Sequence, residues 1–489
     1  MDFSALPTTA FIHPDGENRA EIAALLHQVT DLLVETMAQA TERSPLPEPL
    51  ISADYSWAKI PHNSIDTEKL LAEVKTQLCH SMNAAHPGFI GHMDSIPTTL
   101  SVIADLLVAA LNNNMLSVEM SPVFSRLETL VLQQIAQLFS LGPRANGVLV
   151  SGGSLANLQA LNVARNMAYD ALENGIPQGH QPVFFVSEVA HTSFKKAAMV
   201  MGLGTKAAIP VATDQNSQID IDDLKTKLAQ AKAAGQHPFA IVATAGTTVT
   251  ASIDPIAEIA HIAKLHQLWF HVDAAYGGAL MFSDRYQYRL AGIEQADSVT
   301  FNPQKWLYVA KTCAIVMFRQ FEQLQQHFRV VAPYMHDHDD WPNLGELTVQ
   351  GTRHPDILKL WLSLQHIGRA GYSAIIDHNY ELTKLFTTAV KSRPFLTLAS
   401  EPQMNLVCFR ATPPEVATNR LDQWNHDLQR WLLEKGNTFL SLPMYRGQRW
   451  LKAVLLNPFT TAGHIHTLFE HIDSYHTAQT SAQPLDVRD

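Results

Sequence analysis

Lys305 is the residue whose surroundings in the sequence most clearly predict chemistry. It follows residues 298–301, a β-branched and aromatic run that predicts a buried strand. Pro303 ends this strand, because proline cannot donate a hydrogen bond to a sheet ladder. Lysine is rarely buried without a partner, and desolvation lowers the pKa of its amine, which then becomes a nucleophile suited to Schiff-base formation. A lysine that only lays its stem along apolar surface would give the same pattern, so other residues have to decide.

A glycine turn between a predicted strand and a predicted helix is the second candidate. Residues 148–150 are apolar, and Gly152 and Gly153 follow, where a backbone without side chains can approach a ligand closely. Ser154 can cap the next helix and turn its hydroxyl and N–H groups toward an anion, which the helix N-terminus also favours. The turn therefore predicts a phosphate-binding loop, with an ordinary capped helix as the alternative.

Polar residues also follow three other predicted strands. Asp273 ends the apolar run 268–272, at the edge where open α/β sheets bind ligands, and could pair with a cationic ring nitrogen or cap the next segment. His191 could stack on a planar ligand or be a satisfied core histidine. Thr248 could be a ligand contact or a turn residue. Each signal is weak alone, and their combination is more specific.

Two further patterns predict no binding site. Residues 202–207, Gly-Leu-Gly-Thr-Lys-Ala, superficially match a dinucleotide fingerprint, but a helical pattern precedes them and a strand-like pattern follows, the reverse of the order that fingerprint requires. Residues 336–340, His-Asp-His-Asp-Asp, resemble a metal cluster but lack the spacing of known sites. We therefore predict no metal site, and interpret residues 336–340 as a mobile loop near the active site.

Short apolar runs alternate with helical patterns between residues 147 and 318. This alternation predicts a mostly parallel α/β sheet covered by helices on both faces. The predicted strands are 148–150, 183–186, 240–243, 268–272, 298–301 and 314–318, and the predicted helices include 155–172, 221–234 and 256–265. We expect three parts: an N-terminal helical segment over residues 1–100, a large α/β domain over 101–365, and a small α+β domain over 366–489.

The composition excludes several classes of partner. The chain has 489 residues and a formal net charge of -11, which disfavours binding to nucleic acid or to an anionic membrane. Its three cysteines, Cys79, Cys313 and Cys408, lie far apart, which fits a reducing compartment. The N-terminus lacks the basic start and apolar run of a signal peptide, and no apolar run reaches transmembrane length. We expect a soluble, cytoplasmic protein.

The candidate residues together match the needs of one cofactor. Pyridoxal phosphate requires a Schiff-base lysine, an acidic partner for its ring nitrogen and donors for its phosphate. From about residue 86 to residue 368 the chain resembles the group II pyridoxal-phosphate-dependent amino-acid decarboxylases, which include glutamate, cysteine-sulfinate, aromatic amino-acid and 2,4-diaminobutyrate decarboxylases. The segments that carry the resemblance are 86–93 (HPGFIGHM), 113–124 (NNMLSVEMSPVF), 151–157 (SGGSLAN), 270–276 (FHVDAAY) and 301–306 (FNPQKW).

The resemblance implies a fold-type I homodimer with its active site at the subunit interface, and it assigns roles to single residues. Lys305 would carry the Schiff base, His191 would stack on the cofactor ring, and Asp273 would pair with the ring nitrogen. The other cofactor contacts that it implies are Gly153, Ser154, Thr248, Asp254, Ala275, Asn302 and Gln304. Gln304 stands where the family usually has histidine, and unlike histidine it cannot titrate near neutral pH.

The resemblance also implies which residues meet the substrate. Tyr334 would protonate the reaction intermediate, and Arg353 would bind a substrate carboxylate or form a structural ion pair. His92 and Asp94 occupy the region that contacts the substrate side chain, and Asp94 could favour a second amino group, as could the acidic residues 337–340. We predict α-decarboxylation of a polar aliphatic L-amino acid, acidic or diamino, to its amine and CO₂. Oxidative deamination to an aldehyde, transamination and a non-catalytic scaffold of the same fold are the alternatives.

Overall fold

The structure, a computed structural model, describes residues 6–48, 56–333, 335 and 341–481. The chain divides into two compact units. The larger unit comprises His92–His426 and Ser441–Leu456, and the smaller comprises Met1–Gly91, Asp427–Leu440 and Asn457–Asp489. The expected division into three sequential parts stays a prediction.

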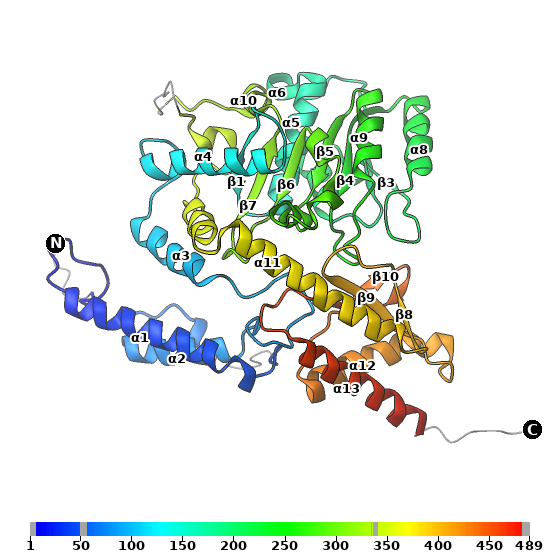
Figure 1. Ribbon diagram of the computed structural model, residues 1–489. Coiled ribbons are helices and arrows are strands. Elements are labelled where there is room, and N and C mark those ends of the chain that lie inside the picture. The colour runs from blue at the N-terminus through cyan, green and yellow to red at the C-terminus, as the bar shows by residue number, and fades with distance from the viewer. Residues whose placement is uncertain (1–5, 49–55, 334, 336–340, 482–489) are drawn as a thin grey trace, which may run out of the picture. The chain divides into compact units, whose positions relative to one another are not determined.

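A seven-stranded sheet forms the centre of the larger unit (Figure 1). Its strands, in spatial order, are β1 (Asn146–Val150), β7 (Ala314–Phe318), β6 (Ser298–Phe301), β5 (Trp269–Asp273), β4 (His237–Thr244), β2 (Pro182–Ser187) and β3 (Ala208–Val211). The strands from β6 to β3 pair in parallel, whereas β7 is antiparallel to both β1 and β6. The predicted α/β class with a mostly parallel sheet is confirmed.

Both faces of this sheet are buried, and that explains why its strands are apolar throughout. Successive side chains of a strand point to opposite faces, so Phe184 and Phe185 belong to two different core clusters. One cluster is covered by α4 (Pro122–Leu138), α8 (Ile221–Ala233) and α9 (Ile256–Leu265), and the other by α5 (Gly153–Tyr169), α7 (Ser193–Val200) and α10 (Phe321–Phe328). Helices connect the parallel strands, as such pairing requires.

The rest of the larger unit comprises a long helix, two small sheets and shorter helices. Helix α11 (Ile357–Lys391) contains Gly368 at φ 69°, which marks a kink between two helical segments. The second sheet is antiparallel, in the order β12 (Leu451–Val454), β9 (Leu406–Ala411) and β8 (Leu396–Leu398). The remaining elements are the hairpin β10 (Met444–Tyr445) and β11 (Gln448–Arg449), α3 (Thr99–Leu111) and α6 (Ala171–Asn174), while α12 (Leu421–Gly436) crosses the boundary between the units.

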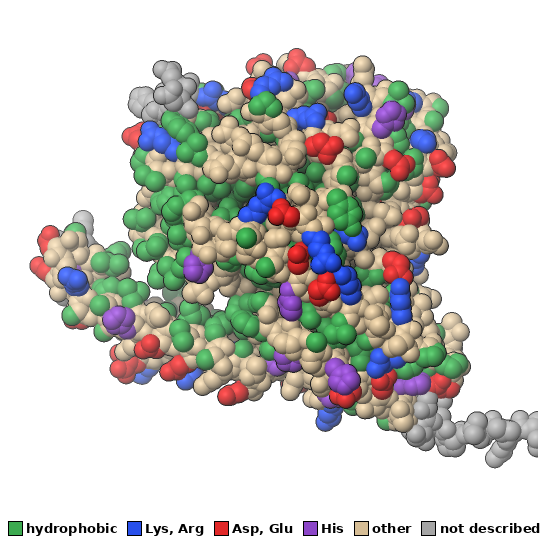
Figure 2. All heavy atoms as spheres, in the orientation of Figure 1, with side chains coloured by type: hydrophobic (Ala, Val, Ile, Leu, Met, Phe, Trp, Pro, Cys, Tyr) green, Lys and Arg blue, Asp and Glu red, His purple; other side chains and the backbone are tan. Residues whose placement is uncertain are grey.

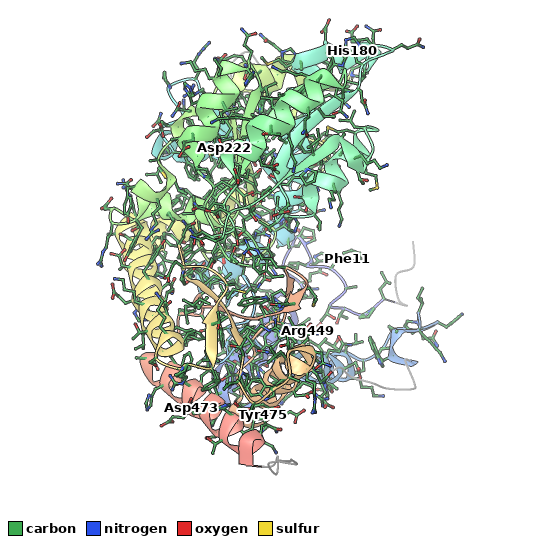
Figure 3. The ribbon with its side chains drawn as sticks, turned by 90° about the vertical axis from the view of Figure 1, so that its right-hand side faces the viewer. Phe11, His180, Asp222, Arg449, Asp473 and Tyr475 are labelled. Carbon is green, nitrogen blue, oxygen red and sulfur yellow. The ribbon has the colours of Figure 1, made fainter. Side chains whose placement is uncertain are left out.

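The smaller unit is helical. It contains α1 (Arg19–Ala38), α2 (Thr67–Cys79), which Asp66 caps, and α13 (Ala462–Ser481). Neither α1 nor α2 contains a buried residue. Phe11, labelled in Figure 3, precedes α1 and is 76% exposed. Within the described residues, none of the helices combines the length and apolar character needed to span a bilayer.

Candidate active site

A cavity of about 430 Å³ lies at the carboxyl edge of the seven-stranded sheet. The carboxyl ends of parallel strands meet at one edge, so the residues that follow β1, β2, β4, β5 and β6 converge there. The cavity is lined by Ser151, Gly152, Gly153, Ser154, Leu155, Asn157, His191, Thr244, Gly246, Thr248, Asp273, Ala275, Asn302, Gln304 and Lys305. Nine of the ten residues predicted from the sequence to contact a cofactor are thus brought together, all but Asp254, although they span more than 150 positions of the chain.

The glycine turn lies directly against Asn302. A Cβ atom added to Gly153 would lie 2.9 Å from Asn302 Nδ2, so a larger residue here would force the Asn302 side chain to shift. Among the described residues, the buried Asn302 Oδ1 has no hydrogen-bond partner. Helix α5 begins at Gly153, so its unpaired N–H groups face the same part of the cavity. This arrangement suits an anionic group such as phosphate.

Asp273 is buried beneath the cavity with both carboxylate oxygens engaged. Its Oδ2 accepts a hydrogen bond from Asn157 Nδ2 at 2.9 Å, and its Oδ1 accepts one from the Ala275 N–H at 3.1 Å. Its side chain is held at the end of β5, and the residue is 5% exposed. Because both oxygens accept hydrogen bonds, the carboxylate keeps one orientation, in which it can pair with a cationic ring nitrogen.

Lys305 and Lys452 are two ammonium groups near the cavity that lack a carboxylate partner among the described residues. Burial is the main cause that lowers the pKa of Lys305, although Asp273 and Asp94 act in the opposite direction. Lys452, on β12, is 6% exposed, and its Nζ donates to the Thr248 carbonyl at 3.3 Å. Burial also lowers the pKa of Lys452. A lowered pKa gives Lys305 the free amine that Schiff-base formation needs.

His191 and Asp254 take different places around the cavity. His191 lines it, and the Ser193 N–H donates to His191 Nδ1 at 3.1 Å, which leaves Nε2 to carry the proton of the neutral ring. Desolvation is the main cause that lowers the pKa of His191. Asp254 lies outside the lining and accepts from the N–H groups of Thr244 and Ile219, at 2.7 and 2.8 Å. These two hydrogen bonds fix the end of β4, and burial raises the pKa of Asp254 to about 7.

Gln304, where the family usually has histidine, has a defined orientation. Its Oε1 accepts a hydrogen bond from the Cys313 N–H at 2.6 Å. An amide whose oxygen is engaged turns its NH₂ group the other way, and Gln304 lines the cavity. The position therefore offers a neutral donor whose protonation does not change with pH.

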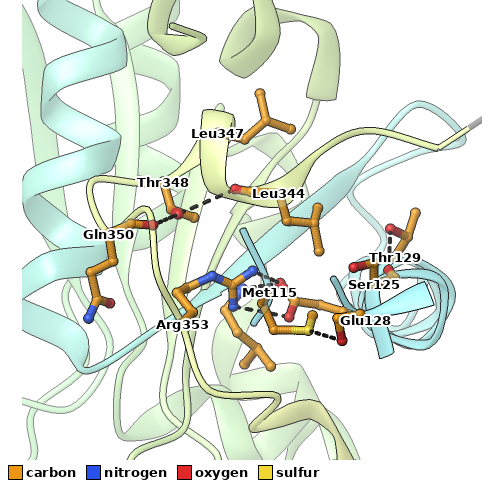
Figure 4. Close-up of polar contacts among 12 residues, drawn as sticks. Met115, Ser125, Glu128, Thr129, Leu344, Leu347, Thr348, Gln350 and Arg353 are labelled. Atoms are coloured by element: carbon orange, nitrogen blue, oxygen red, sulfur yellow. Dashed lines mark hydrogen bonds and ion pairs between the residues drawn. The ribbon is translucent and has the colours of Figure 1, made fainter. Parts of the chain in front are cut away.

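Arg353 forms the structural ion pair that the sequence left open. Figure 4 shows its guanidinium group against the Glu128 carboxylate, with Nη1 and Nη2 at 3.1 and 2.9 Å from the two oxygens. Both side chains are buried, and Glu128 Oε1 also accepts from the Leu149 N–H at 2.9 Å. Arg353 is not among the lining residues, and its bidentate face is already paired. This pairing favours a structural role over recognition of a substrate carboxylate.

The remaining predicted substrate residues lie beyond the cavity lining or outside the described residues. Asp94 Oδ1 forms an ion pair with Lys311 Nζ at 2.6 Å. His92 has a lowered pKa, mainly because of burial, with Lys452, Asp94 and Lys311 as charged neighbours. Tyr334 and residues 336–340 lie outside the described residues, so their predicted roles stay predictions.

Comparison with known proteins identifies the family. Residues 49–412 match the model described as the pyridoxal-dependent decarboxylase conserved domain. The chain belongs to this family. The decarboxylase is 32% identical to L-2,4-diaminobutyrate decarboxylase of Rhizobium meliloti over 471 residues, which cover 94% of this chain and 92% of that protein.

Two other comparisons agree. The decarboxylase is 33% identical to aspartate 1-decarboxylase of Aliivibrio fischeri over 474 residues, which cover 86% of this chain and 85% of that protein. The crystal structure of mouse CSAD superimposes with a TM-score of 0.86 at 28% identity, covering 93% of this chain and 98% of that chain. The predicted family, the predicted cofactor pyridoxal phosphate and the predicted carboxy-lyase activity are confirmed.

Three residues near the cavity were not singled out in the sequence: Asn157, Lys311 and Lys452. Asn157 ends the segment 151–157 and stands three residues after Ser154, so a helical projection could have turned it toward the same site. Lys452 gives a clearer signal, because it interrupts the apolar run 450–456. Lys311 gave none, since its partner Asp94 is more than 200 positions away.

Proposed function

We propose that the cavity at the carboxyl edge of the sheet is where this decarboxylase binds pyridoxal phosphate and its substrate, and that the substrate is a dicarboxylic L-amino acid. The observation that carries the proposal is the presence of Lys305 and Asp273 in one cavity, a lysine of lowered pKa and a hydrogen-bonded carboxylate. These are the two groups that the cofactor requires from the protein.

Different residues of the cavity would contact different parts of the cofactor. The N–H groups at Gly153 and Ser154 and the side chain of Asn302 would hold the phosphate. His191 and Ala275 would pack on opposite faces of the ring, and Asp273 would keep its nitrogen protonated. Pyridoxal phosphate, when bound, supplies a sink for the electrons released with CO₂.

Lys452 is the feature that supports a carboxylate ligand beside the cofactor. A buried ammonium group without a carboxylate partner costs free energy, which an anionic ligand would offset. The α-carboxylate is present in every amino-acid substrate and is the simplest partner for Lys452. Its contact with the carbonyl of Thr248, which lines the cavity, holds Nζ at the required edge.

The ion pair Lys311–Asp94 supports a second carboxylate on the substrate. Asp94 is already neutralised by Lys311 at 2.6 Å and is also close enough to Lys305 and Lys452 to act on their charges. A substrate ammonium group would therefore meet three lysines and one engaged carboxylate. The three lysines would attract a substrate carboxylate, and Lys311 could form an ion pair with it in place of Asp94.

The proposal is tested by measuring CO₂, amine and oxygen with aspartate, glutamate, 2,4-diaminobutyrate and ornithine. We expect one amine per CO₂, no oxygen consumption, and the highest kcat/KM for an acidic substrate. Oxygen consumption with aldehyde formation would contradict simple decarboxylation.

Two substitutions separate the acidic from the diamino assignment. Lys311→Met should lower kcat/KM for the acidic substrate about tenfold, mostly through KM, while Asp94→Asn should leave it unchanged or improve it. Lys384→Met is the matched control, because Lys384 is similarly exposed (56% against 54%) and paired with Glu381 at 2.9 Å. A large loss in Asp94→Asn with a diamino substrate would overturn the acidic assignment.

We propose further that the decarboxylase is a cytoplasmic homodimer. Apolar side chains are exposed on α1, and Figure 2 shows apolar side chains gathered over α3 and α4. They are Leu26, Val29, Leu33, Val34 and Met37 on α1, Ile103, Leu106, Leu107 and Leu111 on α3, and Val123 and Leu130 on α4. Sedimentation should give about twice the chain mass of 54.2 kDa, and Leu106→Glu should lower it. A wild-type monomer would contradict the proposal.

A further inference from the structure

A row of buried polar side chains reaches Asp273 from inside the larger unit. Trp269, His271 and Asp273 occupy alternate positions of β5, so their side chains point to the same face of the sheet. Helix α5 contributes Asn157 on that face, and the neighbouring strand β6 contributes Ser298. All five side chains are at most 6% exposed.

Four hydrogen bonds connect these side chains in sequence. Trp269 Nε1 lies 2.8 Å from Ser298 Oγ, and Ser298 Oγ lies 2.9 Å from His271 Nδ1. His271 Nε2 lies 3.0 Å from Asn157 Oδ1, and Asn157 Nδ2 lies 2.9 Å from Asp273 Oδ2. The row is therefore continuous from an indole ring to the carboxylate at the cavity.

The carboxylate of Asp273 sets the direction of the bonds: Asn157 donates to it and so turns Oδ1 toward His271 Nε2, which must donate and leaves Nδ1 as an acceptor. An indole N–H can only donate, so Ser298 Oγ accepts from Trp269 and is free to donate its own hydrogen to His271 Nδ1. The neutral imidazole then carries its proton on Nε2 and donates it to Asn157 Oδ1. The amide NH₂ group that faces Asp273 also donates to Ser193 Oγ at 3.1 Å. The opposite amide orientation would place two acceptors, or two donors, in contact.

We propose that His271 and Asn157 are positioning residues, which act through this ordered row of donors to fix the orientation and the negative charge of Asp273. Each donor in the row points toward Asp273, and hydrogen bonds aligned in this way polarise and strengthen one another. The proposal rests on the proposed function, because it is the pairing of Asp273 with the cofactor ring that the row serves.

The neutral state of His271 agrees with this arrangement. Burial lowers its pKa to about 4, although Asp273 acts in the opposite direction. A protonated His271 would present hydrogens on both nitrogens, so that Ser298 could no longer donate to it. Because the ring stays neutral, the row supplies oriented dipoles to Asp273 and no counter-charge.

The first test compares two buried asparagines. Asn157→Leu removes the donor to Asp273, whereas Asn425→Leu removes a residue of equal burial that bonds only to backbone groups of Ala411 and Leu421. Both variants should lose stability in urea. Only Asn157→Leu should weaken pyridoxal phosphate binding, measured by titration of the apoprotein, and lower kcat with little change in KM, each about tenfold or more. Equal cofactor affinities in the two variants would overturn the proposal.

The second test uses conservative rescue at His271. A glutamine at this position can accept from Ser298 and donate to Asn157, so His271→Gln should retain most of the cofactor affinity that His271→Leu loses. Nitrogen NMR of the apoprotein should show His271 as the Nε2–H tautomer at pH 7. The Nδ1–H tautomer, or equal losses in the two variants, would contradict the inferred direction. Tautomer and affinity do not depend on turnover, so they distinguish failure of this inference from failure of the decarboxylase assignment.

Discussion

Lys359, which is buried, and Lys305, which is partly exposed to the cavity, are two desolvated lysines with different partners. Lys359, on α11, is 1% exposed and lies 2.7 Å from an oxygen of Asp356 and 3.2 Å from one of Asp105. Burial lowers its pKa, but these carboxylates outweigh burial and raise it. Lys305 has no carboxylate at ion-pair distance among the described residues, and its pKa is lowered.

The charged partner, more than the desolvation that both lysines share, separates the structural lysine from the reactive one. The carboxylates beside Lys359 also form, with His354, a group whose spacing could hold a metal ion. The ammonium group of Lys359 already lies against both carboxylates, at 2.7 and 3.2 Å, which disfavours a second cation there. Lys305 and Lys452 instead have no carboxylate partner among the described residues, so an anionic ligand that pairs with them would offset the free-energy cost of their desolvation.

The largest expected effect is that of Lys305→Ala. Removing the amine should lower kcat by at least about a thousandfold and abolish the absorbance that borohydride reduction traps. Stability should not fall, because the removed ammonium group was desolvated and unpaired. An unchanged rate would show that Lys305 is not the reactive lysine.

Lys359→Met should have the opposite effect: it should lower stability and leave cofactor binding intact. Removing this ammonium group leaves His354 Nδ1 as the one ring nitrogen or cation within ion-pair distance of Asp356 and Asp105 among the described residues, at 3.3 and 4.0 Å. It should lower the free energy of unfolding by about 3 kcal/mol, the lower end for a buried pair because Asp105 is half-exposed. Urea denaturation measures this loss. Cofactor affinity should be unchanged, and a variant that lost the cofactor but not stability would contradict a structural role for Lys359.

Lys452→Met should weaken substrate binding and stabilise the apoprotein. KM for the substrate should rise about tenfold to thirtyfold, while the apoprotein should gain about 1 kcal/mol in stability at pH 7. The folded-state pKa of Lys452 lies below the ordinary 10.5, so the unfolded state binds more protons between these two values. Wild-type stability should therefore rise with pH in that window, and the rise should be smaller in the variant when unfolding is followed between pH 8 and 10.

Gln304→His should have the smallest effect. At pH 8 a neutral imidazole can accept from the Cys313 N–H as the amide does, so kcat should change less than about threefold. Between pH 5 and 8 the pH dependence of the cofactor dissociation constant should differ from that of the wild type, because the new ring protonates beside Lys305. Identical pH profiles would show that this position does not sense the cofactor.

The sequence predicted most of the central sheet because its strands are buried on both faces. Six of the seven strands were predicted, and the missed strand β3 contains Pro210. Proline argues against a central strand, but β3 lies at the edge of the sheet, where a missing donor is tolerated. The antiparallel direction of β7 also could not be predicted, because alternation of side chains is the same in either direction.

The cofactor pocket was predictable for a different reason from the substrate side. Residues at strand ends are local signals, and a parallel sheet necessarily brings them together. Pairing between distant charges has no local signal in the sequence. Glu128 lies 225 positions before Arg353, and no pattern around either residue predicts that the two form an ion pair. The same limit hid the pair Lys311–Asp94 and left the choice between acidic and diamino substrates open.

Helix α1 can make the thermal stability of this protein depend on its concentration. Its twenty residues bury no side chain within their own chain, and a helix of that length is marginal in water without packing. If a second copy supplies the missing contacts, folding of this segment becomes a bimolecular equilibrium. Dilution would then melt α1 before the sheet, and protein concentration would become a variable in its thermal denaturation.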